Sequence, residues 1–313
     1  MRERDLIARI ARRFDGLVLD GARGFSDDAA CLPPVPPGHT RVVTTDAVVE
    51  GVDFRLAWGG ASSAGHRALL QNLSDLSAMG ARPLTFTWAL ALPRAWLDDV
   101  ERLDAFAEGA ARLAARAGVT LAGGDLSSTD GPFVAAITAL GDVLGPPLTR
   151  TSASPGDGIF VAGPLGASRV GLRALSTGVV DESASRAHLW HDDVDLAFGQ
   201  GLVGRARAAM DLSDGLGPDL ARLCRASRVG ARIDSLDAAR AVTSAGRVSL
   251  EDALVGGEDY HLLFTLPPGD DGDDLAPAVR IGTVTDGDEI VLEHDGHARV
   301  LDADDPAFFD HTA

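Results

Sequence analysis

The chain has 313 residues, of which 45% are hydrophobic, so it is long enough to bury one large core or two ordinary ones. Its 46 acidic and 28 basic residues give a formal net charge of -18, which opposes nonspecific binding to nucleic acid or to an anionic membrane. Every basic residue is arginine, which excludes a P-loop lysine and the lysine of protein kinases. Any phosphate chemistry must therefore use metal ions and arginine. A GC-rich genome is the simpler origin of this composition, and adaptation to a salty cytosol is the alternative.

The sequence contains no stretch that predicts a membrane span. Its longest apolar runs, such as residues 133–140, are far shorter than the roughly 20 residues that cross a bilayer. Residues 1–14 mix arginines with apolar residues, which predicts an amphipathic helix rather than a secretory signal. Cys31 and Cys224 are far apart and have no metal-ligand spacing, which argues against a disulfide framework and a zinc site. We therefore expect a cytoplasmic protein with no membrane and no nucleic-acid partner.

The first half of the chain alternates patterns typical of strands and helices. Residues 41–49 are rich in β-branched side chains and follow a turn-forming PPVPPG segment, which predicts a strand. Leucines at helical spacing predict a helix over residues 62–79, with Asn72 and Asp75 together on another face, directed at a common site. The elements predicted next are strands at 84–92 and 132–143, a helix at 95–117, and a short strand at 119–125 that runs into a glycine turn.

The Gly-Pro-Pro-Leu segment at residues 145–148 is the best candidate for a domain boundary, because proline interrupts regular pairing and glycine loosens the chain. It divides the chain into residues 1–146 and 147–313. The second part again mixes both patterns, so the predicted fold class is α/β (α+β). Its predicted elements are a strand at 158–162 and helices at 166–176, 196–209 and 218–227.

Short acidic motifs stand at turns or at the ends of predicted elements. Carboxylates with adjacent hydroxyls are the oxygen ligands that magnesium requires, so together the motifs predict a site for several metal ions. Each motif alone has an alternative explanation, because Asp, Ser and Gly also cap helices and form turns, and paired aspartates usually face water. The motifs are SDDAA at 26–30, TTD at 44–46, NLSD at 72–75, GGD at 123–125 and MDLSDGL at 210–216.

This ordered set, continued by GGEDYHLLF at residues 256–264, resembles the thiamine-monophosphate kinase family of the aminoimidazole ribonucleotide synthetase superfamily. The resemblance runs from Asp27 to His311. It implies an N-terminal domain, residues 1–146, that binds ATP and magnesium and whose strands form a barrel with a second subunit in a homodimer. It also implies a C-terminal domain, residues 147–313, that closes the active-site cleft.

The resemblance implies an activity: transfer of phosphate from ATP to thiamine monophosphate, with several Mg²⁺ ions. Position by position, it also implies roles for individual residues. The implied magnesium ligands are Asp28, Thr44, Thr45, Asp46, Asp75, Asp125, Asp211 and Asp214, of which Asp46, Asp125, Asp211 and Asp214 are the expected catalytic residues. The implied ATP contacts are Gly124, Asp125, Arg150 and Ser213, and the implied substrate contacts are Asp53, Glu258 and Phe309.

The chain departs from the family pattern at Ser26, where glycine is usual, and at Asp53, where histidine is usual. Because thiamine carries a cationic thiazolium, we expect Asp53 to face that ring or a bound cation. Aspartates also replace the usual prolines and arginine within residues 188–199. Arg150 has an alternative role as a surface arginine, and Phe309 as a core residue. A paralogue that binds nucleotide or thiamine phosphate without turnover, or that acts on another phosphorylated acceptor, is the rival interpretation.

Overall fold

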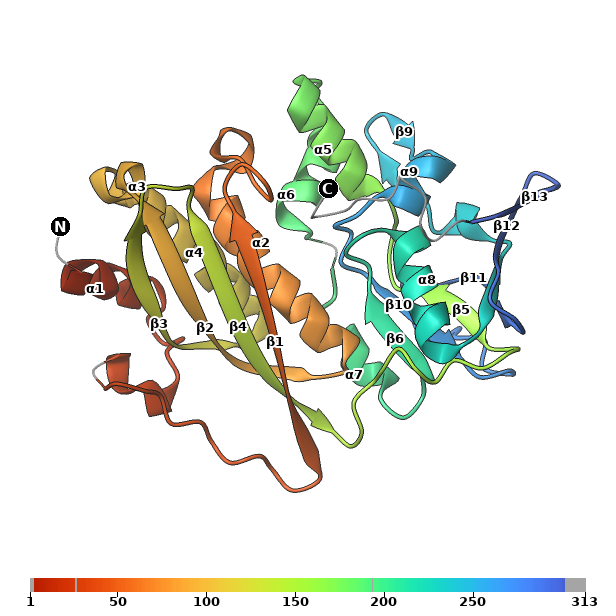
Figure 1. Ribbon diagram of the computed structural model, residues 1–313, viewed down its shortest axis with the longest axis horizontal. Helices are drawn as coiled ribbons and strands as arrows, with labels where there is room; N and C mark the ends of the chain where they lie inside the picture. The colour runs from red at the N-terminus through yellow and green to blue at the C-terminus, as the bar shows by residue number, and fades with distance from the viewer. Residues whose placement is uncertain (1–2, 26, 193, 302–313) are drawn as a thin grey trace. The chain divides into compact units, whose positions relative to one another are not determined.

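The computed structural model describes residues 3–25, 27–192 and 194–301, which form two compact units (Figure 1). Unit 1 comprises the described residues up to Leu76 together with Ala81–Gly145. Unit 2 comprises Ser77–Gly80 and the described residues from Pro146 onward. The chain therefore passes from unit 1 to unit 2 inside the Gly/Pro-rich segment at 145–148.

Unit 1 is built on a four-stranded sheet in the order β1-β4-β2-β3. The β2 and β3 strands are parallel, and the other neighbouring pairs are antiparallel. The sheet is open within the chain, with β1 and β3 at its edges, and a barrel across a dimer stays a prediction. The strands are β1 (His39–Val49), β2 (Arg82–Pro93), β3 (Thr120–Thr129) and β4 (Val134–Leu144).

Two long helices of unit 1 approach each other closely enough to bring their backbones into contact. A Cβ on Gly65 would lie 1.9 Å from the Phe106 carbonyl oxygen, and a Cβ on Gly109 would lie 1.8 Å from the Ser62 carbonyl oxygen. Only glycine fits at either position, so the pair fixes how α2 and α4 cross. The helical elements are α1 (Glu3–Arg13), η1 (Asp20–Phe25), α2 (Leu56–Ala78), α3 (Arg94–Asp98) and α4 (Val100–Ala117).

Unit 2 is built on a seven-stranded sheet in the order β13-β12-β7-β11-β5-β10-β6. Its strands are β5 (Gly158–Val161), β6 (Ala208–Asp211), β7 (Gly230–Ile233), β10 (Leu262–Leu266), β11 (Val279–Thr285), β12 (Ile290–His294) and β13 (His297–Val300), and a separate pair is formed by β8 (Val242–Thr243) and β9 (Gly246–Arg247). Its helices are α5 (Ala167–Thr177), α6 (Glu182–Trp190), α7 (Phe198–Leu202), α8 (Leu216–Ser227), η2 (Leu236–Ala238) and α9 (Leu250–Val255). No helix in the described residues is both long and apolar enough to cross a membrane.

The central strands of this sheet are buried on both faces. Ile159 and Val161 of β5 join one hydrophobic core, while the alternate residue Phe160 joins a second core that includes Phe264 of β10. Alternate side chains of a strand point to opposite faces, so a strand covered on both sides is apolar throughout. This explains the apolar run GIFV and the nearly apolar run LLFTL, in which the buried Thr265 hydroxyl accepts the Ala208 N–H. It also makes the sheet a rigid support for the loops that leave it.

The helix predicted over residues 196–209 is wrong. The α7 helix ends at Leu202, and β6 begins at Ala208. Gly199, Gly201 and Gly204 weaken the helix, and Gly204 has a left-handed φ of 79°. The apolar residues of β6 are buried beside β10 and pair with it through backbone hydrogen bonds, which they could not form as part of a helix.

We predict that Gly109→Ala destabilises the protein by about 1–3 kcal/mol or more, because the added methyl group would collide with a backbone oxygen that cannot move aside easily. The matched control is Gly201→Ala. Gly201 is an exposed helical glycine with open space around its Cβ position, so this change should be neutral or slightly stabilising. Chemical denaturation of the three proteins checks the prediction, and equal stability of the two variants would contradict it.

Candidate functional site

The edge strand β1 brings two of the predicted metal ligands to the face covered by α2. Thr44 and Asp46 alternate along β1 and so share a face, and the Thr44 hydroxyl donates a hydrogen bond to the Asp75 carboxylate of α2. The Thr45 side chain lies on the opposite face. Its hydroxyl donates to the Ile137 carbonyl oxygen at 2.9 Å. The structure thus brings Thr44 and Asp75 together, while the Thr45 side chain is directed elsewhere.

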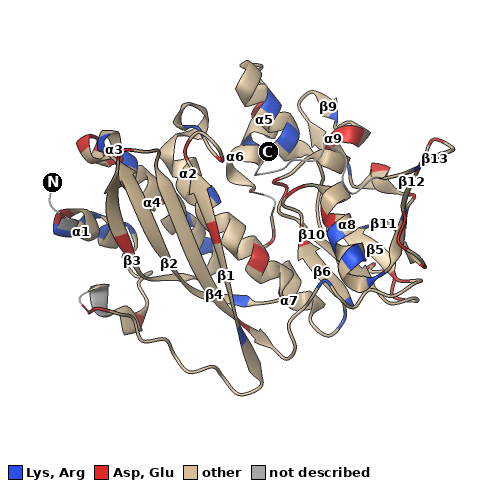
Figure 2. Cartoon of the chain, in the orientation of Figure 1, with Lys and Arg blue, Asp and Glu red and all other residues tan. Residues whose placement is uncertain are grey.

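Unit 1 also contains a cavity of about 610 Å³ whose lining includes Asp27 and Asp28 of the first acidic motif and Gly124 and Asp125 of the GGD motif. This volume is in the range of small-molecule sites. Asp125 and Gly124 lie on β3, and Asp125 accepts a hydrogen bond from the Ser127 hydroxyl at 3.1 Å. A Cβ on Gly124 would lie 2.3 Å from the Trp88 ring, so a larger residue is excluded there. The strands of this sheet carry few charges apart from isolated acidic segments, including those on β1 and β3 (Figure 2).

In unit 2 the motif at residues 210–216 lies beside the motif at residues 256–264. Asp211 ends β6 and is paired with Leu262 of β10. Beyond the strands, the Glu258 N–H donates to the Ser213 carbonyl oxygen at 2.7 Å. The Tyr260 N–H donates to the Leu212 carbonyl oxygen at 2.8 Å. Two loops far apart in sequence are therefore joined backbone to backbone, and both carry predicted site residues.

A residue that the sequence analysis did not single out, Asp219, holds the first of these loops. Its side chain is fully buried and accepts the N–H groups of Asp214 and Gly215 at 2.9 and 3.1 Å. Arg222 donates to the other carboxylate oxygen at 2.5 Å. Burial raises the pKa of Asp219 to about 6, the Asp214 carboxylate adds to the rise, and Arg222 opposes it. In the sequence, the sign of this role is that Asp219 is an acidic residue in the first turn of the helix α8, where N–H groups lack partners within the helix.

Arg222 also forms an ion pair with Asp214, one of the implied metal ligands. Across the residues the structure describes, no three Asp, Glu, His or Cys side chains are close enough together to hold a metal ion. The donor chemistry nevertheless fits magnesium, because the implied ligands in both units offer only hard carboxylate and hydroxyl oxygens. Asp214 would exchange its contact with Arg222 for the metal.

The remaining predicted site residues are placed as follows. The Asp53 carboxylate accepts the Val49 N–H at 2.7 Å, so it closes the turn after β1. Arg150 is exposed, and its guanidinium makes no hydrogen bond or ion pair with the described residues. Glu258 is half-buried beside His188. Phe309, like Ser26, lies outside the described residues.

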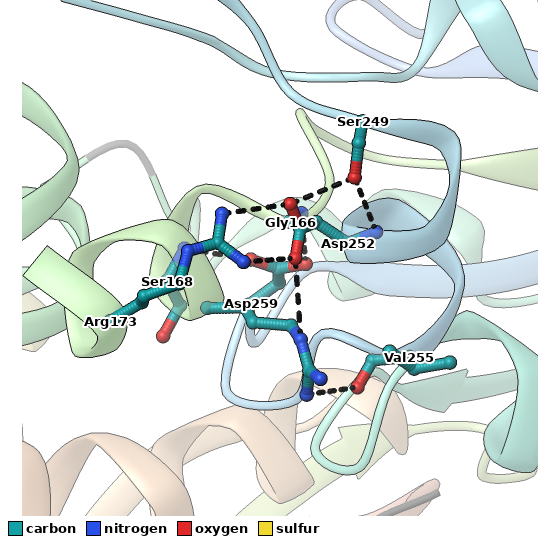
Figure 3. Close-up of polar contacts among 8 residues, drawn as sticks. Gly166, Ser168, Arg173, Ser249, Asp252, Val255 and Asp259 are labelled. Carbon is teal, nitrogen blue, oxygen red and sulfur yellow. Dashed lines mark hydrogen bonds and ion pairs between the residues drawn. The ribbon is translucent and has the colours of Figure 1, made fainter. Parts of the chain in front are cut away.

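The acidic residue after Glu258 has a clear structural role that the sequence analysis missed. The Asp259 carboxylate accepts the Gly166 N–H at 2.7 Å and the Ser168 N–H at 3.4 Å (Figure 3). Gly166 is the N-cap of α5 and has no side chain, so Asp259 supplies the missing cap from a distant loop. Close by, Asp252 binds Arg173 through two hydrogen bonds of 2.9 and 3.0 Å. The GGEDY motif thus anchors a helix as well as carrying Glu258.

The two units correspond to two known domain families. Residues 26–143 match the family described as AIR synthase related protein, N-terminal domain, and residues 154–295 match its C-terminal domain. The class is therefore that of AIR synthase-related proteins with both domains in one chain.

Within that class the similarity is more specific. The chain is 36% identical to the thiamine-monophosphate kinase of Rhodopirellula baltica over 84% of this chain and 83% of the relative. The crystal structure of thiamine-monophosphate kinase from Stenotrophomonas maltophilia K279a is 34% identical, with a TM-score of 0.77 over 94% of this chain and 96% of that one. The structure of AaThiL complexed with AMPPCP and TMP is 28% identical, with a TM-score of 0.75 over 95% of this chain and 96% of that one. The chain belongs to the thiamine-monophosphate kinase family.

We predict that Asp219→Ala loosens the loop at residues 211–217 and lowers stability by about 2–6 kcal/mol. The change leaves two buried N–H groups without an acceptor, each at a cost of about 1–3 kcal/mol. Hydrogen exchange should therefore be faster at the Asp214 and Gly215 amides. Asp237→Ala is the control, because the Asp237 carboxylate is half-exposed and pairs with Arg240 rather than with a backbone N–H of the described residues. Unchanged exchange at both amides in Asp219→Ala would contradict the assigned role.

Proposed function

We propose that the chain transfers the γ-phosphoryl group of ATP to thiamine monophosphate and so produces thiamine diphosphate. The observation that carries the proposal is the similarity, along 95% of the chain, to a structure that holds both AMPPCP, an ATP analogue, and TMP. The residues that the chemistry needs are present in this sequence, in the order that the family requires. The acidic motifs support the same assignment: those at 44–46 and 123–125 lie within β1 and β3, the one at 72–75 lies within α2, and the one at 210–216 follows from the end of β6 into a loop.

Magnesium would be held by the hard oxygens of Asp28, Thr44, Thr45, Asp46, Asp75, Asp125, Asp211 and Asp214. Bound magnesium supplies neutralisation of the phosphate charge. On the protein side, Gly124, Arg150 and Ser213 contact the nucleotide together with Asp125. The exposed guanidinium of Arg150, which pairs with no residue that the structure describes, can bind a phosphate through its fork of N–H donors.

The acceptor needs no strong general base. The second pKa of a phosphate monoester is about 6, so the acceptor phosphate is mostly a dianion at neutral pH and is itself the nucleophile. The work of the protein is to hold the two phosphates in line against their mutual repulsion, with Asp46, Asp125, Asp211 and Asp214 as the catalytic residues. Transfer is therefore direct, without a covalent phosphoenzyme.

The acceptor is contacted by Asp53, Glu258 and Phe309. A carboxylate attracts the cationic thiazolium of thiamine, so Asp53 and Glu258 face the thiamine part rather than the phosphate. Asp53 performs this role in addition to its hydrogen bond with the Val49 N–H. The working protein is a cytoplasmic homodimer whose four-stranded sheets form a shared barrel.

The rival proposal is a paralogue that binds the same ligands without turnover or takes another phosphorylated acceptor. The ion pair between Arg222 and Asp214 is the observation in its favour, because it engages an implied metal ligand. Turnover of thiamine monophosphate decides between the two proposals.

We predict that thiamine monophosphate is phosphorylated and that thiamine is not, because the proposed site uses a phosphate oxygen as nucleophile and has no base to deprotonate an alcohol. The measurement is the formation of ADP and thiamine diphosphate with each acceptor under identical conditions. Thiamine diphosphate should form only from the monophosphate. Comparable kcat/KM for the two acceptors would contradict the mechanism, and no turnover of either would favour the paralogue.

We also predict that Asp46→Asn lowers kcat by about a hundredfold or more at saturating magnesium, because it removes a charged oxygen ligand worth several kcal/mol in the transition state. Fold stability should change little, since the amide has the same shape. Asp15→Asn, at an exposed residue outside the predicted site, is the control and should keep wild-type turnover. Near wild-type turnover in Asp46→Asn would remove this residue from the metal site.

A further inference from the structure

The α6 helix ends in two buried histidines that no part of the proposed chemistry uses. His188 is 1% exposed and His191 is 3% exposed. They belong to the segment at residues 188–199, where the sequence departs from its family. Both contact the loop that follows α9: His188 lies beside Glu258, and His191 lies beside Tyr260. The departure therefore falls on a segment that supports the GGEDY motif.

His188 contacts both Glu258 and Ser168 through one ring nitrogen, Nδ1. The His188 Nδ1 lies 3.4 Å from a carboxylate oxygen of Glu258 and 2.9 Å from the Ser168 hydroxyl oxygen. A carboxylate only accepts hydrogen bonds, so the tautomer that suits this position carries its proton on Nδ1. In that tautomer the Nδ1–H donates to the Ser168 hydroxyl and lies within ion-pair distance of Glu258. Hence His188 fixes the Glu258 side chain to the first turn of α5.

The helix that carries His188 is itself fixed. A Cβ on Gly171 of α5 would lie 2.1 Å from the Ala184 carbonyl oxygen of α6, so the two helices touch through their backbones. Asp259 in turn caps α5. The His188 Nδ1 is thus held in place relative to the Glu258 carboxylate.

The loop needs such support because its backbone is strained. Glu258 and Tyr260 both have left-handed φ angles, 63° and 55°, which side-chain-bearing residues adopt only at a cost. The His191 ring packs edge-on against the Tyr260 ring at 5.0 Å between centroids and 82° between planes. The Glu258 N–H is bonded to Ser213. The loop is therefore held at three points: the Glu258 N–H by Ser213, the Tyr260 ring by His191, and the Glu258 side chain by His188.

We propose that His188 is a positioning residue that orients the Glu258 carboxylate toward the acceptor, with His191 supporting the same loop. This inference rests on the proposed function in one respect, the contact of Glu258 with thiamine monophosphate. His188 contacts the side chain of Glu258, which is expected to bind the acceptor rather than the nucleotide, so loss of the histidine affects the acceptor and not the nucleotide.

Two substitutions separate the effect of losing the N–H donor of His188 from the effect of changing the volume of its side chain. His188→Leu fills the buried space but has no donor, whereas His188→Asn is smaller and retains an N–H near the position of Nδ1. We expect His188→Leu to raise the KM for thiamine monophosphate by about tenfold or more, with the KM for ATP unchanged within about twofold. His188→Asn should recover most of the acceptor affinity. His297→Asn, at an exposed histidine of β13, is the control and should behave as wild type.

The contrary results are equally defined. An unchanged KM for thiamine monophosphate in His188→Leu overturns the proposal. If the KM for thiamine monophosphate and the KM for ATP rise equally in both His188→Leu and His188→Asn, the proposal is also overturned, because an effect that does not depend on the donor indicates a purely structural residue.

A second measurement keeps this inference distinct from the proposed function. Hydrogen exchange over residues 256–261 should be faster in His188→Leu than in wild type by about tenfold, and close to wild type in His188→Asn. If the wild-type protein makes no thiamine diphosphate, the proposed function fails, and the exchange result alone decides whether His188 positions the loop. Exchange that is the same in His188→Leu and wild type overturns the positioning role whatever the activity.

Discussion

The candidate site in unit 2 depends on the backbone pairing between the loops at residues 211–217 and 256–261. Two N–H groups of one loop, those of Glu258 and Tyr260, donate to carbonyl oxygens of the other. The pairing continues the β6–β10 ladder beyond the ends of the strands. It requires glycine at position 257, where a Cβ would lie 2.8 Å from the Ser213 carbonyl oxygen. The GG of the motif is therefore a requirement of close approach, and the acidic residues that flank it are placed by that approach.

The aspartates of this acidic chain separate into two groups by their surroundings. Those that are buried in unit 2, such as Asp219, Asp252 and Asp259, accept backbone N–H groups or pair with arginine. Buried carboxylates need such partners, because an unpaired buried charge is very costly. Asp28 and Asp125 are exposed and line a cavity instead. The second group is better suited to bind a charged ligand, because its exposed carboxylates have weaker structural bonds to give up, such as the one that Asp125 accepts from the Ser127 hydroxyl.

Much of the fold could be predicted from local patterns, and the exceptions have physical reasons. The strands at 41–49 and 84–92 and the helix at 218–227 were recognisable because period-two and helical spacings are local properties. The helix predicted at 196–209 failed because its last residues form a strand only in the presence of β10, a partner more than fifty positions away in the sequence. The acidic motifs were recognisable as a set. The roles of Asp219 and Asp259 were not, because each carboxylate is defined by the N–H groups that it accepts, and those depend on the tertiary fold.

The segment at residues 188–199 shows what a departure from a family pattern can mean. Judged from sequence, the replacement of prolines and an arginine by aspartates suggested lost contacts. In the structure, the start of this segment contributes two buried histidines that contact Glu258 and Tyr260. Asp259, between those residues, caps the helix that packs against α6. Three consecutive residues of one loop thus contact or cap a single helix pair, so a change in α6 acts directly on Glu258. The start of this segment therefore supports the Glu258 carboxylate, and the aspartates that distinguish the segment follow directly after that support.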